Sequence, residues 1–115
     1  MIENKNVSVT AETPEFKAML AHAQSLIDAY YAANGYDVAH KPVITATEGP
    51  RYFRVMKLEG PAEKPISNSV YVFIDKSNGD ILKAAGWKAP VKGARGNIFS
   101  GSLDCLTHHG VVYLR

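Results

Sequence analysis

The stretch from Ser69 to Ala85, SVYVFIDKSNGDILKAA, constrains the fold of this chain more than any other feature. Its first part, Ser69–Asp75, consists largely of β-branched and aromatic residues, which suit a pleated and half-buried surface. Asn78 and Gly79 follow at the point where the chain must reverse, since both residues tolerate a positive φ angle. Asp80–Ala85 then returns as the partner strand. The pattern predicts a β-hairpin whose tight turn spans residues 75–80.

A long amphipathic helix is predicted from Pro14 to Ala33. Thr13 suits the N-cap position, and proline is favoured at the first helical position that follows it. Asn34 and Gly35 supply a stop, because both accept the left-handed conformation that ends a helix. Apolar residues recur at helical spacing between these ends. They are Phe16, Met19, Leu20, Ala23, Leu26, Ile27, Tyr30 and Tyr31. This face is wide enough to cover a small sheet.

Two further strands are predicted between the helix and the hairpin, at residues 42–47 and 51–58. Residues 60–65, GPAEKP, form a loop by composition. The last segment, Gly110–Arg115, is either a short final strand or an extended docking segment. The connections are too short to hold crossover helices, so the sheet is expected to be antiparallel. The predicted fold class is α+β, with one long N-terminal helix packed on a three- to four-stranded antiparallel sheet.

Length and composition place the chain among ordinary globular domains. Its 115 residues suffice for a single domain, 1–115, of which 1–12 is expected to be a loosely held tail. No apolar run approaches the roughly 18 residues that a membrane-spanning helix needs, and the N-terminus lacks an apolar leader region. The single cysteine, Cys105, excludes an internal disulfide and suits a reducing compartment.

Positive charge is concentrated in one part of the sequence. The net charge is only +2, yet residues 81–103 hold four of the thirteen basic residues and none of the eleven acidic ones. The centre of this region is Trp87–Asn97, WKAPVKGARGN, hereafter the basic loop. Lysine and arginine attract phosphate, glycine lets backbone N–H groups approach it, and tryptophan can stack on a base. The candidate ligand-binding residues are Lys83, Trp87, Lys88, Lys92, Arg95, Gly96 and Asn97. The competing interpretation is a solvated loop that closes the core.

Other chemistries find weaker support in the sequence. Residues 75–80 are rich in oxygen ligands, but the glycine falls one place early for a calcium loop and Gly86 stands where glutamate is needed. Cys105 and His108 have a spacing that can seat zinc, yet further ligands such as His22 would have to come from distant segments. Neither a catalytic triad order nor a phosphate-loop motif is present. No metal or cofactor is expected, and no residue pattern argues for an enzyme.

The C-terminal 45 or so residues resemble a pattern found in small bacteriophage-encoded proteins of unknown function. The shared segment reads D-K-x-x-G-D-I-x-K-A-A-x-W-K-A-P-x-K-x-x-R-G-N. The matching residues are Asp75, Gly79, Asp80, Lys83, Trp87, Lys88, Pro90, Lys92, Arg95, Gly96 and Asn97, with a Tyr113–Arg115 tail. The resemblance implies a location in the bacterial host cytoplasm or the virion. It also implies a nucleic-acid or protein partner in place of a metabolic role.

Two functions therefore remain open. The first is a small binding protein for phosphate-bearing ligands, either single-stranded nucleic acid or a nucleotide, that uses the basic loop. The second is a protein–protein interaction module, such as an inhibitor of a host protein or a small virion component. That module would use an exposed aromatic patch around Tyr52, Trp87 and Phe99, or a free sheet edge.

Overall fold

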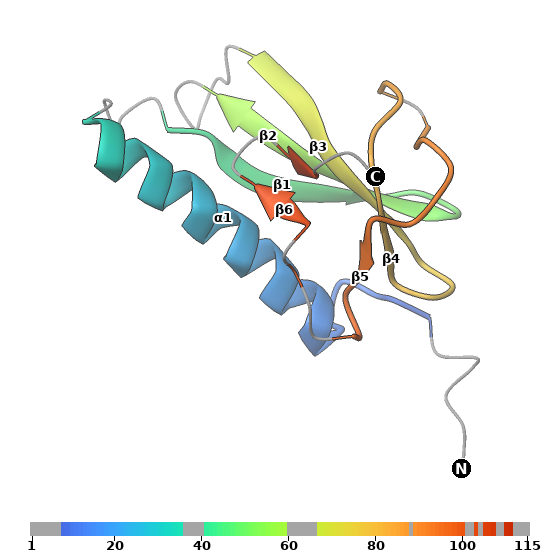
Figure 1. The fold of residues 1–115 in the computed structure, drawn as a ribbon. Coiled ribbons are helices and arrows are strands. Elements are labelled where there is room, and N and C mark those ends of the chain that lie inside the picture. Colours follow the sequence, from blue (N-terminus) through green and yellow to red (C-terminus); the bar gives the residue numbers. More distant parts are fainter. Residues whose placement is uncertain are drawn as a thin grey trace.

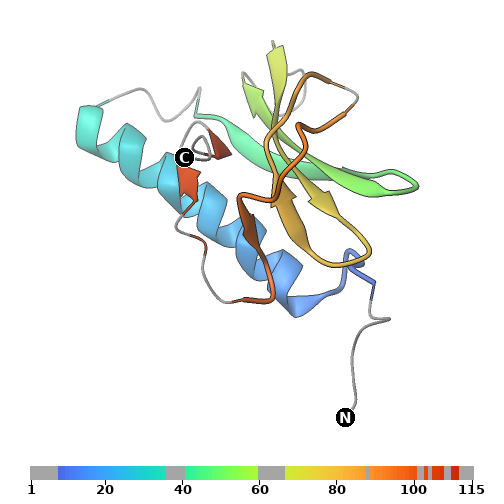
Figure 2. The same ribbon diagram turned by 45° about the vertical axis from the view of Figure 1, so that its right-hand side comes forward.

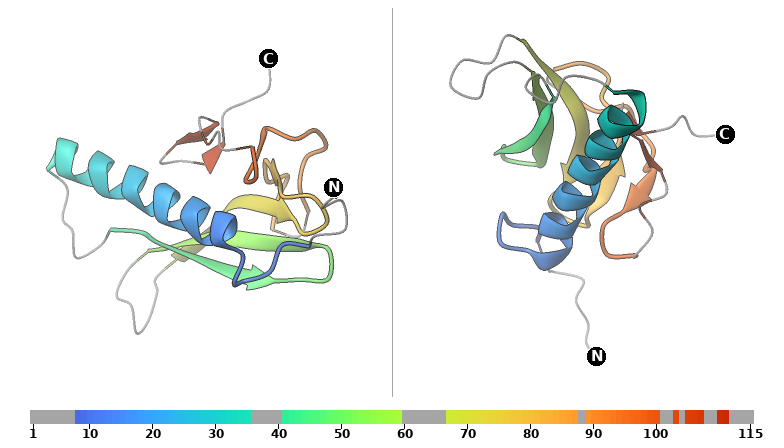
Figure 3. Two further views of the ribbon diagram at one scale, coloured as in Figure 1. Left: turned by 90° about the horizontal axis from the view of Figure 1, so that it is seen from below. Right: turned by 90° about the vertical axis from the view of Figure 1, so that its left-hand side faces the viewer.

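The described part of the chain folds into one helix, a twisted antiparallel sheet and a separate small hairpin. The computed structural model describes residues 8–35, 41–59, 67–87, 89–100, 103, 105–107 and 110–111. Helix α1 (Pro14–Asn34) precedes strands β1 (Val43–Glu48), β2 (Tyr52–Glu59), β3 (Ser67–Asp75), β4 (Asp80–Leu82) and β5 (Gly96–Asn97). These five strands form one sheet in chain order, and α1 lies across one of its faces (Figures 1 and 3). Strands β6 (Leu106–Thr107) and β7 (Gly110–Val111) form a separate small hairpin.

The fold class agrees with the prediction, but the number of strands does not. The sheet has five strands where three to four were expected. The extra strand is β5, which lies within the basic loop and pairs with β4 through Asp80↔Asn97 and Ile81↔Gly96. Strand β5 is only two residues long, and two residues cannot show the alternation of apolar and polar side chains that predicts a strand. The short strand β7 covers the first two residues of the predicted 110–115 segment, while 112–115 and the predicted loop at 60–65 lie outside the described residues.

The predicted helix is present, although its N-terminal cap differs. The Thr13 hydroxyl makes no capping bond to the helix. It accepts a hydrogen bond from the backbone N–H of Thr10 at 2.8 Å, because the chain before the helix folds back in a tight turn. The first helical bond is donated by the Lys17 N–H to the Thr13 carbonyl, at 3.0 Å. At the other end, Gly35 adopts a left-handed conformation with φ of 67°, as expected of a helix stop.

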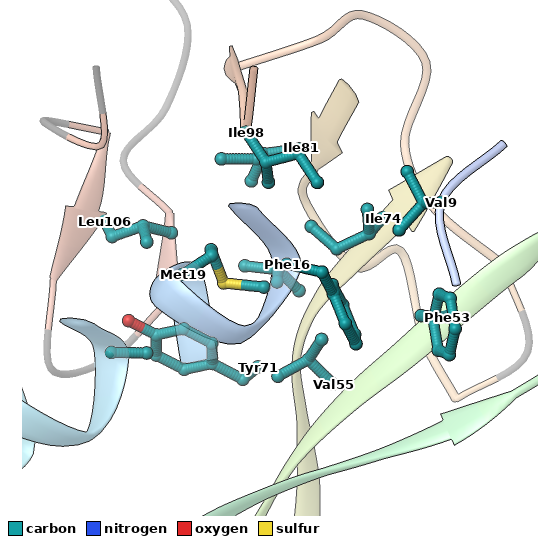
Figure 4. Close-up of a cluster of buried hydrophobic side chains, with 12 residues drawn as sticks. Val9, Phe16, Met19, Phe53, Val55, Tyr71, Ile74, Ile81, Ile98 and Leu106 are labelled. Carbon is teal, nitrogen blue, oxygen red and sulfur yellow. The ribbon is translucent and has the colours of Figure 1, made fainter. Parts of the chain in front are cut away.

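The apolar face of α1 packs against β2 and β3. The buried helix residues are Phe16, Met19, Ala23 and Ile27. The Phe16 ring lies 4.3 Å from the Phe53 ring, centroid to centroid, and Figure 4 shows Phe16 and Met19 directed toward the strand side chains. Fully burying a large apolar side chain stabilises a fold by about 1.5–3 kcal/mol. Burial of these four side chains therefore contributes substantially to stability.

The chain before the helix also belongs to the core. Residues 1–12 were expected to be loosely held, but Val9 is fully buried in the core cluster. Its backbone N–H donates a hydrogen bond to the Lys76 carbonyl at 2.7 Å. The ordered structure thus begins before α1, and Val9 fills a position beside Phe53 and Ile74 (Figure 4).

An irregularity in β3 turns Tyr71 into the core. Val55 pairs with Val72 and Met56 with Val70, so Tyr71 is the extra residue of a β-bulge. Its side chain is buried, and its hydroxyl donates a hydrogen bond to the Thr107 carbonyl at 2.5 Å. Burial raises the pKa of Tyr71 above its usual value, and electrostatic repulsion by the nearby Cys105 raises it further. The bulge therefore links the main sheet to the small β6–β7 hairpin.

The turn between β3 and β4 is tight, as predicted, but uses only one positive φ angle. Gly79 has φ of 83°, whereas no non-glycine residue in the described part of the chain has positive φ. Asn78 contributes through its side chain instead, since its Oδ1 accepts a hydrogen bond from the Asp80 N–H at 2.8 Å. The Asp75 carboxylate accepts bonds from the N–H and hydroxyl of Ser77. The oxygen atoms of Asp75 and Asn78 thus accept hydrogen bonds that stabilise the turn.

Replacing Gly79 by alanine tests this turn. A Cβ atom there would stand 2.7 Å from the Phe99 ring and 2.9 Å from Ile98, in a backbone conformation that strains any L side chain. We expect Gly79→Ala to lower the free energy of unfolding by about 2 kcal/mol, as measured by urea denaturation. Gly86→Ala is the matched control, because nothing lies within 4 Å of its Cβ position. Its effect should stay within about 0.5 kcal/mol, and equal losses in the two variants would contradict the assignment.

Candidate interaction surface

The first part of the basic loop belongs to a hairpin that extends β4. The Val91 N–H donates to the Lys83 carbonyl at 2.7 Å, and the Ala85 N–H donates to the Ala89 carbonyl at 3.0 Å. Ala84 and Pro90 form an isolated bridge between these two bonds. The described residues 83–87 and 89–91 therefore form a hairpin, hereafter the tip hairpin, whose end carries Trp87. It projects from the end of β4 (the orange segment in Figures 1 and 2).

The tip hairpin and the residues after it cover part of the sheet face opposite α1. Side chains alternate along β2, so Tyr52 and Arg54 point away from the face that contacts the helix. Phe73 pairs with Arg54 on one side and with Leu82 on the other. Phe73 is only 2% exposed and Leu82 only 8%, yet neither belongs to the main core cluster. A second, small apolar cluster thus forms on this face, and residues 90–94 of the basic loop line the hollow beside Leu82.

Trp87 is held by an arginine from β2 that points to the same face of the sheet. The Arg54 Nε donates a hydrogen bond to the Trp87 carbonyl at 2.8 Å, and the guanidinium carbon lies 4.8 Å from the centroid of the indole ring. This distance is within the range of a cation–π contact. Trp87 nevertheless keeps 44% of its surface exposed. The geometry presents a large aromatic side chain to solvent in a fixed position.

Arg95 is directed back into its own loop. Its Nη1 donates to the Gly93 carbonyl at 2.6 Å and more weakly to the Lys92 carbonyl at 3.4 Å. Its Nε is buried and has no hydrogen-bond partner among the described residues. Gly93 has φ of 97°, so the chain reverses sharply where the guanidinium binds it. Arg95 therefore stabilises the loop from inside.

Gly96 and Asn97 also make intramolecular contacts. A Cβ atom at Gly96 would stand 2.8 Å from the Cys105 Sγ, so only glycine allows this approach. The Asn97 amide nitrogen donates to the Asn78 carbonyl at 2.8 Å and to the Asp80 carboxylate at 3.0 Å. Asn97 thus fastens β5 to the turn that precedes β4.

The structure does not bring all seven predicted site residues to one surface. Trp87 and Lys92 are exposed and Lys83 is half-buried, while Lys88 lies outside the described residues. Arg95, Gly96 and Asn97 make the intramolecular contacts described above. A ligand cradle made by the whole set therefore remains a prediction, for which Trp87 and Lys92 present the most accessible side chains of the described members.

Three residues of the surface were not recognised as basic-loop partners from the sequence. Arg51 and Arg54 lie more than thirty positions before the loop, and Tyr52 was considered only as part of an aromatic patch. Arg51 lies with its guanidinium carbon 5.2 Å from the Tyr52 ring centroid. The available signal was the alternation of Tyr52 and Arg54 along one strand, but the sequence does not show which face of that strand is buried.

A hollow of about 450 Å³ separates the basic loop from the strands. Its charged lining residues are Arg51 and Lys92 on the positive side and Asp75 and Asp80 on the negative side. Opposite charges therefore balance within it. An anion entering this hollow would approach two carboxylates as well as two cations, so its electrostatics suit a contact of mixed charge better than a lone phosphate.

The predicted aromatic patch is divided between two places. Tyr52 packs edge-on against Phe73, with ring centroids 5.8 Å apart, and lies on the same face as Arg54 and Trp87. Phe99 is 41% exposed, but its ring packs at the Gly79 turn.

Residues considered for metal binding do not assemble among the described parts of the chain. No group of three histidine, cysteine, aspartate or glutamate side chains there is placed to hold a metal ion. His40, His108 and His109 lie outside the described residues. Cys105 is half-buried and packs against Gly96.

These features define a one-helix α+β domain with a five-stranded antiparallel sheet and a projecting aromatic hairpin. Within the described ranges, none of the helical structure has the length and apolar character needed to span a membrane. The chain belongs to DUF7717, a family of unknown function, whose model matches residues 3–108. No curated protein and no solved structure matches it.

The role assigned to Arg95 can be tested by stability. Removing it leaves the Gly93 carbonyl without its charged donor, so Arg95→Ala should lower the free energy of unfolding by about 1–2 kcal/mol. Lys92→Ala removes a neighbouring, exposed cation, and its effect should stay within about 0.5 kcal/mol. Both values follow from urea denaturation at neutral pH. If Arg95→Ala leaves the free energy of unfolding unchanged, the guanidinium is dispensable for the loop. Arg95 would then return to the set of candidate ligand-binding residues.

Proposed function

We propose that this chain is a small binding protein whose contact surface is Trp87, the Arg54 side chain that holds it, and Tyr52 on the same face of β2. The partner that this surface fits best is another protein. The observation that carries the proposal is the half-exposed Trp87, fixed by a hydrogen bond and a cation–π contact to Arg54.

The chemistry of the three residues supports a protein partner. Tryptophan, tyrosine and arginine are the residue types most enriched among those that dominate binding energy at protein interfaces. An aromatic ring that is already held in place loses little conformational entropy on binding. The balanced charges of the adjoining hollow, Arg51 and Lys92 against Asp75 and Asp80, suit a polar rim around such a contact.

The resemblance to small bacteriophage proteins suggests which partner this is. On that basis the partner is a host protein that the chain inhibits, or another protein of the virion. The corresponding locations are the bacterial host cytoplasm and the virion. This part of the proposal depends on the resemblance of residues 75–97 and not on the geometry of the surface.

Phosphate-bearing ligands are the second candidate. The exposed Lys92 and the half-exposed Trp87 lie in the same loop, and Lys83 and Lys88 belong to the same acid-free stretch of sequence. In this alternative Trp87 stacks on a base while the lysines approach the phosphates of single-stranded nucleic acid or a nucleotide. It ranks second because Asp75 and Asp80 line the adjoining hollow.

Alanine substitution combined with capture from host lysate separates these functions. We expect Trp87→Ala and Arg54→Ala each to weaken capture of the partner protein by about 30-fold, or about 2 kcal/mol, because they remove central contact residues. Phe99→Ala is the matched control, since it removes an aromatic side chain of similar exposure at the Gly79 turn. Nuclease treatment should not change the captured protein. Capture that survives Trp87→Ala undiminished would refute the proposed surface.

The phosphate alternative has its own test in fluorescence. Trp87 is the only tryptophan in the chain, so its emission reports on this loop alone. If nucleic acid binds here, single-stranded oligonucleotide should quench the emission and the affinity should fall steeply with salt. Lys92→Ala should then reduce the salt dependence by roughly one charge. Emission that is unchanged by oligonucleotide at low salt would exclude this candidate.

A further inference from the structure

A second hollow, of about 250 Å³, lies between the β1–β2 turn and the strands. It is lined by residues 47–50 of the turn and by Arg51, Tyr52, Arg54 and Phe73. Arg51 and Tyr52 also line the larger hollow beside the basic loop, so the two hollows adjoin. The second one is hereafter the arginine hollow. Because Arg54 contacts Trp87 as well, the arginine hollow borders the proposed contact surface.

The backbone that carries Arg51 is held from three directions. The Gly49 N–H donates to the Tyr52 carbonyl at 2.9 Å, and the Lys76 N–H donates to the Arg51 carbonyl at 3.0 Å. The Lys76 ammonium donates to the Gly49 carbonyl at 2.9 Å. The β1–β2 turn is thus fastened both to β2 and to the turn after β3, and Arg51 starts from a fixed point.

Each of the two guanidinium groups lies near an aromatic ring. The guanidinium carbon of Arg51 is 5.2 Å from the Tyr52 ring centroid, and that of Arg54 is 4.8 Å from the Trp87 ring centroid. Such a contact restrains a guanidinium while its N–H groups can still reach an acceptor. Both arginines of the hollow are therefore partly ordered before any ligand binds.

Most donors of these two arginines have no acceptor in the described part of the chain. Arg54 uses its Nε donor on the Trp87 carbonyl, and a guanidinium has five N–H donors. The Arg51 side chain makes no hydrogen bond to a described residue, and neither arginine forms an ion pair with a described carboxylate. The hollow thus offers two forked cations to an anion.

The carboxylate that lines the arginine hollow is already neutralised. Glu48 Oε2 lies 2.6 Å from the Lys76 Nζ. Asp75 and Asp80 line the larger hollow and form no ion pair with Arg51. The charge that a ligand meets in the arginine hollow is therefore positive, in contrast to the balanced charge next to it.

We propose that the arginine hollow binds a glutamate or aspartate side chain of the partner protein. Arg51 and Arg54 donate to the carboxylate oxygens, since the planar fork of arginine matches carboxylate geometry. The proposal rests on the proposed function, because the protein that contacts Trp87 supplies this side chain. It adds the chemistry that this protein must carry, an acidic residue beside the group that packs on Trp87. Phosphate shares the forked geometry, but carboxylate is present on a partner protein without modification.

Arg51→Gln tests the hollow without disturbing Trp87. The Arg51 side chain makes no hydrogen bond to a described residue, so the variant should keep the urea midpoint of the parent. The probe is N-acetylglutamate amide, followed through the NMR signals of the arginine Nε–H groups. It should shift the Arg51 and Arg54 signals saturably, whereas the neutral N-acetylglutamine amide should not. Arg51→Gln should weaken binding by about tenfold, because a charge-assisted hydrogen bond is lost. Lys17→Gln is the matched control, since it removes an exposed cation from α1 on the other side of the sheet.

Capture of the partner protein from host lysate separates this inference from the proposed function. Arg51→Gln should weaken capture by about tenfold, and Lys17→Gln should leave it unchanged. Capture that is lost with Trp87→Ala but unchanged with Arg51→Gln would overturn the arginine hollow and leave the Trp87 surface standing. The reverse result would refute the Trp87 surface and support the hollow. Equal binding of the glutamate and glutamine amides, or tighter binding of inorganic phosphate than of N-acetylglutamate amide, would overturn the carboxylate assignment.

Discussion

Both faces of this sheet carry buried apolar side chains, and the described part of the chain supplies one helix to cover them. Helix α1 packs its buried face against β2 and β3, with Phe16 and Phe53 in direct ring contact. Side chains of β2 and β3 alternate between the helix side and the opposite side, except at the Tyr71 bulge. Phe73 and Leu82 lie on that opposite side, where Tyr52 packs against Phe73 and residues 90–94 line the hollow beside Leu82.

This requirement explains why the basic loop is structured as it is. A loop that only carried charge would need few internal contacts. Here Arg95 binds the Gly93 carbonyl, Asn97 joins β5 to the turn before β4, and Gly96 admits the Cys105 sulfur atom. These contacts hold the loop against the sheet, and they leave Trp87 at the end of a braced hairpin with Arg54 beside it. The same packing of the basic loop therefore places residues 90–94 beside the second face of the sheet and exposes Trp87 to solvent.

The edge strand β1 shows a related division of roles. Gln24 projects from the helix and binds one backbone donor and one backbone acceptor next to the edge, at Ile44 and Pro42. Nearby, the hydrogen bond from Lys41 holds the pKa of the Asp28 carboxyl below its usual range, and Asp28 in turn accepts a bond from Gln24. The helix therefore both covers the sheet and limits which groups of its edge stay available.

The sequence by itself determined the elements whose signals are local. The α1 periodicity, the Gly35 stop and the β3–β4 turn depend on residues within a few positions of one another, and all three are present. The tertiary structure alone decided the strand count, the burial of Val9 and the roles of the basic residues. Arg54 and Trp87 are 33 positions apart, and Asn97 and Asn78 are 19 apart. These contacts join residues that are far apart in the sequence and depend on how the helix packs on the sheet. A charge pattern shows which residues are polar, but not which backbone carbonyl each of them will bind.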